Sequence, residues 1–400
     1  MKMFRWSIII IIFITPILSG CWNSRELNEL SITTGLGIDK VDDQYLFTTQ
    51  IINPGEVSKE SNDERTTVTT TQETGDTLFE AWRKLTKTTS SKLYFSHVRV
   101  LVIGEELAEE GVSKILDVML RDHEYRSDFF VLIAKDNKAN DILSILTTMD
   151  QIPGDKLFQS LRSSSTAYGT TTEVQLDKFI TDLVSTGKNL VVSGVFIVGD
   201  KEEGKYESKY KVINPEVYLK YGPLAVFKQD KLVEWMDDKE SRGYNFSQGN
   251  IQSTLVNVPC IDGDGMVGVE IINTKAKISA EELNKQMQGS VNVKVNGNIM
   301  DSECKNPQAL NDPKYMNQFQ EKMNDTIEKE ISASIKKAQE SYKSDVFGFG
   351  SALHRQHPKV WKEVELKWQD VFPDMMVNVK VDSAIHNTGS ISQSPEVGGG

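Results

Sequence analysis

The sequence predicts a mixed α/β and α+β protein of two to three lobes, with an antiparallel sheet and one long helix in its C-terminal domain. Strand-like and helix-like segments alternate through the first half, which is typical of an α/β layer architecture. In the second half, strand-like segments separated by turns precede one long amphipathic pattern. With 400 residues, 38% of them hydrophobic, the chain is long enough for two to three domains of about 150 residues.

The predicted N-terminal mixed α/β domain, residues 21–200, opens with a hairpin whose strands are residues 32–38 and 45–52. Residues 58–77 are polar and lack a helical period, which indicates a solvated loop or an edge strand. Strands are then predicted at 97–103, 128–134 and 190–198. One helix is predicted to follow a capping box at 77–80, and further helices are predicted around 112–119, 142–146 and 172–184. Residues 151–172 are rich in Ser, Thr, Gly and Pro, which favours a junction or a mobile loop.

A charged connection at residues 201–215 leads to the predicted C-terminal α+β domain, residues 216–386. Its strand-like runs are 223–227, 251–258, 266–277 and 291–300, and the turn sequence at 262–265 favours antiparallel pairing. Asp312 and Pro313 supply the N-cap and first-turn proline of a helix of about thirty residues, roughly 45 Å long. A helix at 359–368, an alternating strand at 377–385 and a flexible tail at 387–400 complete the chain.

The composition excludes several classes of function. Asp and Glu outnumber Lys and Arg by 57 to 45, and the resulting net charge of −12 disfavours a nucleic-acid partner. Charged residues make up 26% of the chain, which excludes a multi-span membrane protein. Three cysteines and five histidines leave little material for a metal centre, and we expect no cofactor. Cys260 and Cys304 belong to no C-x-x-C motif and are predicted to be unpaired thiols.

The first 21 residues have the organisation of a lipoprotein export signal. Lys2 and Arg5 precede an apolar stretch of about a dozen residues, which is too short to cross a bilayer as a permanent helix. Leu-Ser-Gly then precedes Cys21, a pattern similar to the bacterial lipobox, in which the cysteine receives a diacylglyceryl group. We therefore predict a signal peptide at 1–20 and a mature chain held to the membrane by acyl chains on Cys21. An ordinary signal peptide or an uncleaved anchor is the alternative.

Candidate catalytic motifs are incomplete, so we predict no catalytic residues. The Gly-Leu-Gly at 35–37 has Lys40 where a dinucleotide-binding loop needs its third glycine. His354 and His357 have the spacing of metal ligands on a helix, but no cysteine and no further histidine before His386 accompanies them. Packing of His354 beside the turn at 347–350 is the preferred interpretation.

Several short motifs lie in order along the mature chain. They are residues 20–22 with 25–30, then 34–40, 95–97, 222–227, 240–243, 343–350 and Trp361. With these motifs in this order behind a lipobox, the chain resembles the spore germination lipoprotein family. The members of that family are the C subunits of nutrient germinant receptors in endospore-forming bacteria. The resemblance implies a three-lobed lipoprotein, including a small middle lobe, that acts with integral-membrane A-type and B-type subunits. It also implies no catalysis, since the family is not known for any.

Two of these motifs contain candidate partner or structural residues. Trp22, which shares its motif with Arg25, suits either the lipid headgroup level or packing into its own domain. The second motif contains Phe347, Gly348, Phe349 and Gly350. Its glycines relieve backbone strain while its rings seat against the long helix, or else it forms a partner surface.

Together with the lipobox, the resemblance implies a membrane-anchored, non-catalytic receptor subunit that is required to begin spore germination in response to nutrients. It would lie on the outer face of the cytoplasmic membrane, which in spores is the inner spore membrane. Membrane lipid and the A-type and B-type subunits are the expected partners. A solute-binding lipoprotein, which would deliver a nutrient to a transporter by closing two similar α/β lobes, is the leading alternative. A tethered cell-wall hydrolase is a third class.

Overall fold

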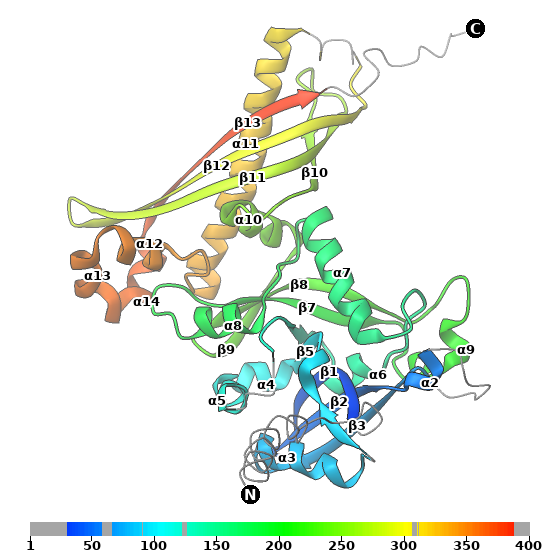
Figure 1. Cartoon of the computed structure of the whole chain (residues 1–400). Helices are drawn as coiled ribbons and strands as arrows, with labels where there is room; N and C mark the ends of the chain where they lie inside the picture. Colours follow the sequence, from blue (N-terminus) through cyan, green and yellow to red (C-terminus); the bar gives the residue numbers. More distant parts are fainter. Residues whose placement is uncertain are drawn as a thin grey trace, which may run out of the picture.

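The computed structural model describes residues 30–57, 66–89, 91–121, 126–305, 310 and 312–387. These residues form two β-sheets with helices packed on both (Figure 1), and the predicted mixed, multi-domain fold class is confirmed. Cys21, Trp22 and Arg25 lie outside the described residues, as do the predicted signal peptide and residues 388–400 of the predicted tail.

The first sheet has nine strands in the order β3-β2-β1-β5-β6-β7-β8-β9, with β4 added beside β1. Their bounds are β1 Leu30–Val41, β2 Gln44–Ile52, β3 Val68–Gly75, β4 Lys92–Tyr94, β5 Val100–Gly104, β6 Phe130–Ala134, β7 Val191–Val198, β8 Tyr218–Lys228 and β9 Lys231–Met236. The central strands β1, β5, β6 and β7 are parallel, and antiparallel pairs flank them. The predicted first hairpin is therefore confirmed. Strand β3 is an edge strand, one of the two alternatives predicted for 58–77, while residues 58–65 of that range lie outside the described residues.

Helices cover both faces of this sheet, because β5 and β6 are buried along their whole length and need apolar partners on each side. One face packs on α3 Leu78–Lys84, α4 Glu105–Glu110, α5 Ser113–Arg121 and α8 Leu176–Leu183. The other face packs on α6 Ala139–Ser144 and α7 Pro153–Ala167. Two short helices, α2 Pro54–Val57 and α9 Glu207–Tyr210, lie in connections.

Helix α7 contradicts the prediction of a junction or mobile loop at 151–172. Pro153 occupies the first turn, where its missing N–H costs nothing, and Leu157 and Leu161 are buried against the sheet. Because serines fill much of the last two turns, the sequence has too few apolar residues to show a helical period. Tertiary packing decides the conformation of this segment.

The nine-stranded sheet continues past the predicted connection at 201–215. Strand β8 follows that connection and pairs antiparallel with β7, with Val226 opposite Val191. Residues on both sides of the connection therefore share one sheet. The domain limits stay predictions.

The second sheet has the order β10-β11-β12-β13 and carries the long helix α11. Its strands are β10 Thr254–Pro259, β11 Met266–Leu283, β12 Gln286–Ser302 and β13 Met376–Asn387. The first three are antiparallel, as predicted, but β13 runs parallel to β12. A parallel neighbour needs a long crossover, which the helices between β12 and β13 provide.

Helix α11, Pro313–Lys337, continues through a π-helical turn at Ala338–Tyr342, which confirms the prediction of one helix of about thirty residues. The Asp312 carboxylate accepts hydrogen bonds from the backbone N–H groups of Lys314 and Tyr315 and so caps its N-terminus. The helix buries one stripe, which comprises Phe319, Met323, Ile327, Ile331, Ser334 and Ile335. The remaining helices are α10 Asp238–Gln248, α12 Phe349–Gln356, α13 Pro358–Val364 and α14 Trp368–Val371.

Cys260 and Cys304 form a disulfide, so the prediction of two unpaired thiols is wrong. Cys260 follows β10 and Cys304 follows β12, and both strands end beside the start of β11. This arrangement brings the two Cα atoms within 5.8 Å although 44 positions separate them in sequence. The pairing depends on strand order, which no local motif reveals.

Candidate functional site: the junction around Asp345

The segment 343–350 connects the end of α11 to α12, and its centre is the carboxylate of Asp345. This side chain is buried and accepts four hydrogen bonds from N–H groups. Its Oδ1 accepts from the backbone of Gly348 at 2.8 Å and of Phe349 at 3.2 Å. Its Oδ2 accepts from the backbone of Gly350 at 2.8 Å and from Nε1 of Trp368 at 2.9 Å. Asp345 thus caps the start of α12 and holds α14 against it.

The electrostatics of Asp345 combine two opposing effects. Burial raises the pKa of its carboxyl above the ordinary value for an aspartate, while the N–H donors of Gly350, Trp368, Gly348 and Phe349 pull that pKa back down. The four N–H donors offset the free-energy cost of removing this carboxylate from water. If donors were lost, that desolvation cost would destabilise the folded protein.

The two glycines of the turn are needed for different structural reasons. Gly348 has φ +85°, in the left-handed region that favours glycine, so the predicted relief of strain is confirmed there. Gly350 is helical, but a Cβ at this position would lie 2.6 Å from Nε1 of Trp368 and 2.8 Å from Cα of Gly187. Close approach of two backbones, rather than an unusual dihedral, therefore requires glycine at Gly350.

The same segment is hydrogen-bonded to the nine-stranded half of the molecule, which consists of the first sheet and the helices packed on it. The N–H of Ser351 donates to the carbonyl of Gly187 at 2.8 Å, and the N–H of Asn189 donates to the carbonyl of Asp345 at 2.8 Å. The Ser344 hydroxyl donates to the carbonyl of Phe227, in β8, at 2.7 Å. Segment 343–351 is therefore the junction that fixes the helices of the second half against the first sheet.

Phe347 and Phe349 are buried inside this junction. Phe347 packs against Tyr244 of α10 and against Phe349, with ring centroids 5.8 and 6.1 Å apart, and Phe349 lies 6.2 Å from Phe372. Both rings belong to the core cluster that contains the buried stripe of α11. Their burial favours the structural interpretation of the motif over a partner surface formed by these rings.

His354 lies on α12, which begins within the motif, and its ring stacks on Trp361 with centroids 5.7 Å apart. Among the described residues, one group has its potential metal ligands close together, namely Cys260, Asp262 and Cys304. In that group the two sulfur atoms are bonded to each other, so they are not available to a metal. Asp345 and Trp368 are not among the candidate site residues that the sequence predicts, although an aspartate three residues before a glycine and a helix start is a usable capping signal.

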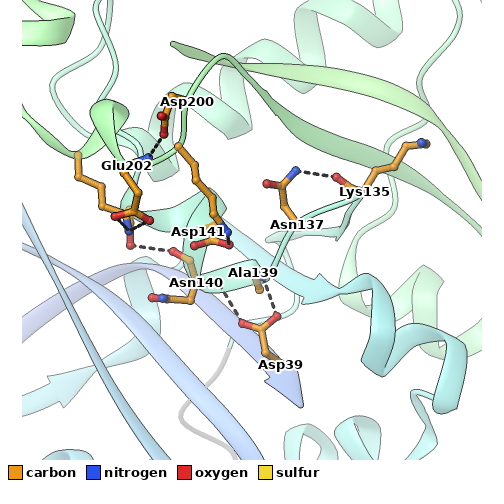
Figure 2. Close-up of polar contacts among 11 residues, drawn as sticks. Asp39, Lys135, Asn137, Ala139, Asn140, Asp141, Asp200 and Glu202 are labelled. Carbon is orange, nitrogen blue, oxygen red and sulfur yellow. Dashed lines mark hydrogen bonds and ion pairs between the residues drawn. The ribbon is translucent and has the colours of Figure 1, made fainter. Parts of the chain in front are cut away.

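A second polar site lies at the C-terminal ends of the parallel strands (Figure 2). The Asp39 carboxylate, at the end of β1, accepts from the N–H groups of Ala139 at 2.7 Å and Asn140 at 3.0 Å, at the start of α6. A Cβ at Gly104, the last residue of β5, would lie 2.1 Å from Oδ1 of Asp39. Burial raises the pKa of Asp39 to about 6, against the lowering effect of those two backbone donors.

A cavity of about 550 Å³ lies over this edge of the sheet and is lined by several acidic side chains. Ligand sites of α/β proteins often occupy such an edge. Here Asp39 bonds to the backbone of α6, and Asp141 accepts from Nζ of Lys201 at 2.7 Å. The contacts assign Asp39 a structural role that joins β1 to α6.

The chain belongs to the spore germination protein family. Residues 23–197 match the family model described as spore germination protein N-terminal domain, and residues 223–389 match the model described as spore germination B3/GerAC like, C-terminal. The resemblance seen in the sequence is confirmed.

Individual relatives match over nearly the full length. The chain is 32% identical over 381 residues to spore germination protein KC of Bacillus subtilis strain 168, with 93% of each chain covered. It is 23% identical over 390 residues to spore germination protein B3 of the same organism, with 96% and 98% covered. The crystal structure of the GerBC protein has the same fold, with a TM-score of 0.55 at 19% identity over 88% of this chain and 96% of that one.

Proposed function

We propose that the protein is a lipid-anchored, non-catalytic subunit of a nutrient germinant receptor, required to begin spore germination when nutrients are present. The observation that carries this proposal is the similarity to spore germination protein KC, which extends over 93% of both chains. Both family models also match, so the two halves of the chain are those of a spore germination protein. The A-type and B-type integral-membrane subunits are the proposed partners.

Membrane attachment is proposed through Cys21. Within the parts of the chain that the structure describes, no helix is both long enough and apolar enough to cross a membrane. A diacylglyceryl group on Cys21, joined by a further acyl chain, supplies the two or more chains that stable anchoring needs. The net charge of −12 repels anionic headgroups, so lipid rather than charge would hold the protein at the outer face of the cytoplasmic membrane or the inner spore membrane.

The two alternatives fit the architecture less well. A solute-binding protein closes two similar α/β lobes, whereas here a mixed nine-stranded sheet meets a four-stranded one of different order. Hinge closure would also have to break the backbone hydrogen bonds between the junction and residues 187 and 189. For a hydrolase, the buried carboxylates of Asp39 and Asp345 are poor candidates, because both are occupied by backbone N–H donors.

Complementation of spores that lack this chain tests the proposal. The wild-type chain should restore germination with one set of nutrients from a panel of amino acids and sugars. Cys21→Ala should fail to restore it and should incorporate no fatty-acid probe. Full nutrient responses in the deletion spores would contradict the receptor role, while equal probe labelling of both chains would contradict the anchor alone.

A further inference from the structure

A groove of about 980 Å³ runs along the junction beside Asp345. The nine-stranded half lines it with α5, the end of α8 and the turn that follows α8. The second half lines it with Asp345 and with residues of the segment 365–370, which includes the first three residues of α14. These helices lie on the same side of the molecule in Figure 1. Since both halves form its walls, the groove exists only while the junction is intact.

Three large apolar side chains in the groove are exposed to solvent. Leu120 of α5 is 63% exposed, Val184 at the end of α8 is 69% exposed, and Leu366, in the turn before α14, is 100% exposed. Single exposed apolar residues are normal, but three from separate elements around one groove form the kind of patch that marks an interaction site.

The charges of the groove have one sign. Asp117, Asp230, Glu365 and Asp370 line it, and no lysine, arginine or histidine stands among the described residues that do so. Asp117 pairs with Arg121 beyond the lining at 2.9 Å, an exposed pair that solvent screens. Such a surface repels an anionic membrane, and it also disfavours a second copy of this acidic chain.

We propose that this groove docks a basic amphipathic segment of a partner protein. The apolar side chains of that segment would cover Leu120, Val184 and Leu366, and its lysine or arginine side chains would face the carboxylates of the walls. Charge complementarity selects this occupant, since an apolar stripe flanked by cations matches both features of the groove. The proposal does not depend on the receptor role, because it follows from the groove alone.

A binding measurement with the full mature chain in detergent tests the proposal. The probe is a short synthetic helix of leucine and lysine, compared with a counterpart that has glutamate in place of lysine. The lysine peptide should bind the wild-type chain, and Leu366→Asp should weaken that binding about tenfold or more. Ile213→Asp is the matched control, since Ile213 is 107% exposed and lies outside the groove. It should leave the binding unchanged.

The variant Leu366→Asp distinguishes docking of the peptide in the groove from attraction by charge alone. Leu366→Asp adds a negative charge, so attraction by charge alone would strengthen peptide binding, and that result would overturn the proposal. Equal binding of the glutamate peptide would overturn it too. Self-association that Leu366→Asp abolishes would assign the groove to a second copy instead. Leu120→Asp, on the opposite wall, should reproduce the loss, and unchanged thermal melting of both variants confirms that they are folded.

Discussion

Nε1 of Trp368 donates a 2.9 Å hydrogen bond to the carboxylate of Asp345, 23 positions earlier in the sequence. Both groups are buried, and the same carboxylate binds three backbone N–H groups at the start of α12. One side chain therefore fixes two helices, and the backbone carbonyl of Asp345 accepts a hydrogen bond from the N–H of Asn189 in the other half of the molecule. The structural integrity of the junction depends on Asp345.

Asp345→Asn should lower the free energy of unfolding by about 2–4 kcal/mol. An amide oxygen replaces only one of the two acceptor atoms, and the amide nitrogen then faces N–H donors at the other position. Urea unfolding followed by tryptophan fluorescence measures the change. Asp374→Asn, at an exposed position, is the matched control and should cost less than about 0.5 kcal/mol. Equal stability of the two variants would refute the role given to Asp345.

Protonation of Asp39 should make the protein more stable at pH 5 than at pH 7. Its pKa is about 6 in the folded protein against an ordinary value of 3.8, so the folded state binds the proton more tightly than the unfolded state. The stabilisation from this proton is fully present below pH 3.8 and is lost as the pH rises through 6. It amounts to about 3 kcal/mol for this group. Unfolding midpoints at pH 5 and 7 should differ less in Asp39→Asn than in the wild type, and identical pH dependence would contradict the assignment.

Gly104→Ala should be destabilising through its contact with Asp39. The new Cβ would lie 2.1 Å from Oδ1 of Asp39, so the carboxylate must leave the N-terminus of α6. We expect a loss of about 1–3 kcal/mol in the wild-type background and a smaller loss in Asp39→Ala, where the obstacle is gone. A double-mutant cycle by thermal unfolding measures this coupling. Strictly additive effects would show that the two residues do not interact.

The disulfide should be detectable by thiol counting on the denatured, unreduced protein. Cys260 and Cys304 should contribute no reactive thiol before reduction and two after it. With 44 positions between the cysteines, the loop-entropy model gives a loss of about 4 kcal/mol for Cys260→Ser. Two reactive thiols without reductant, besides any from Cys21, would rule out the bridge.

Local sequence patterns predict those helices and strands that are determined by residues within the segment itself. The N-cap Asp312, the first-turn Pro313 and a regular apolar stripe act within α11, so its position and length were predictable. Helix α7 was missed because its stability comes from packing on the sheet. The parallel direction of β13 and the pairing of Cys260 with Cys304 are set by strand order, which one sequence does not contain.

The candidate site was predicted only in part for the same reason. The motif at 347–350 is recognisable in the sequence, and the left-handed backbone of Gly348 is the kind of strained position that its glycine predicts. The need for glycine at Gly350 comes from Gly187 and Trp368, which lie far from it in sequence. The spacing of Asp345 before Gly348 is a capping signal, but the bond from Trp368, 23 positions later, depends on packing that one sequence does not contain.

The most direct test of the receptor role compares two stimuli on spores that lack this chain. Dipicolinate release and loss of optical density would be followed after nutrients and after calcium dipicolinate, which is expected to act on cortex hydrolysis downstream of the receptors. The deletion spores should fail to respond to one set of nutrients and should still germinate with calcium dipicolinate. Intact responses to every nutrient, or equal loss of the calcium dipicolinate response, would contradict the account.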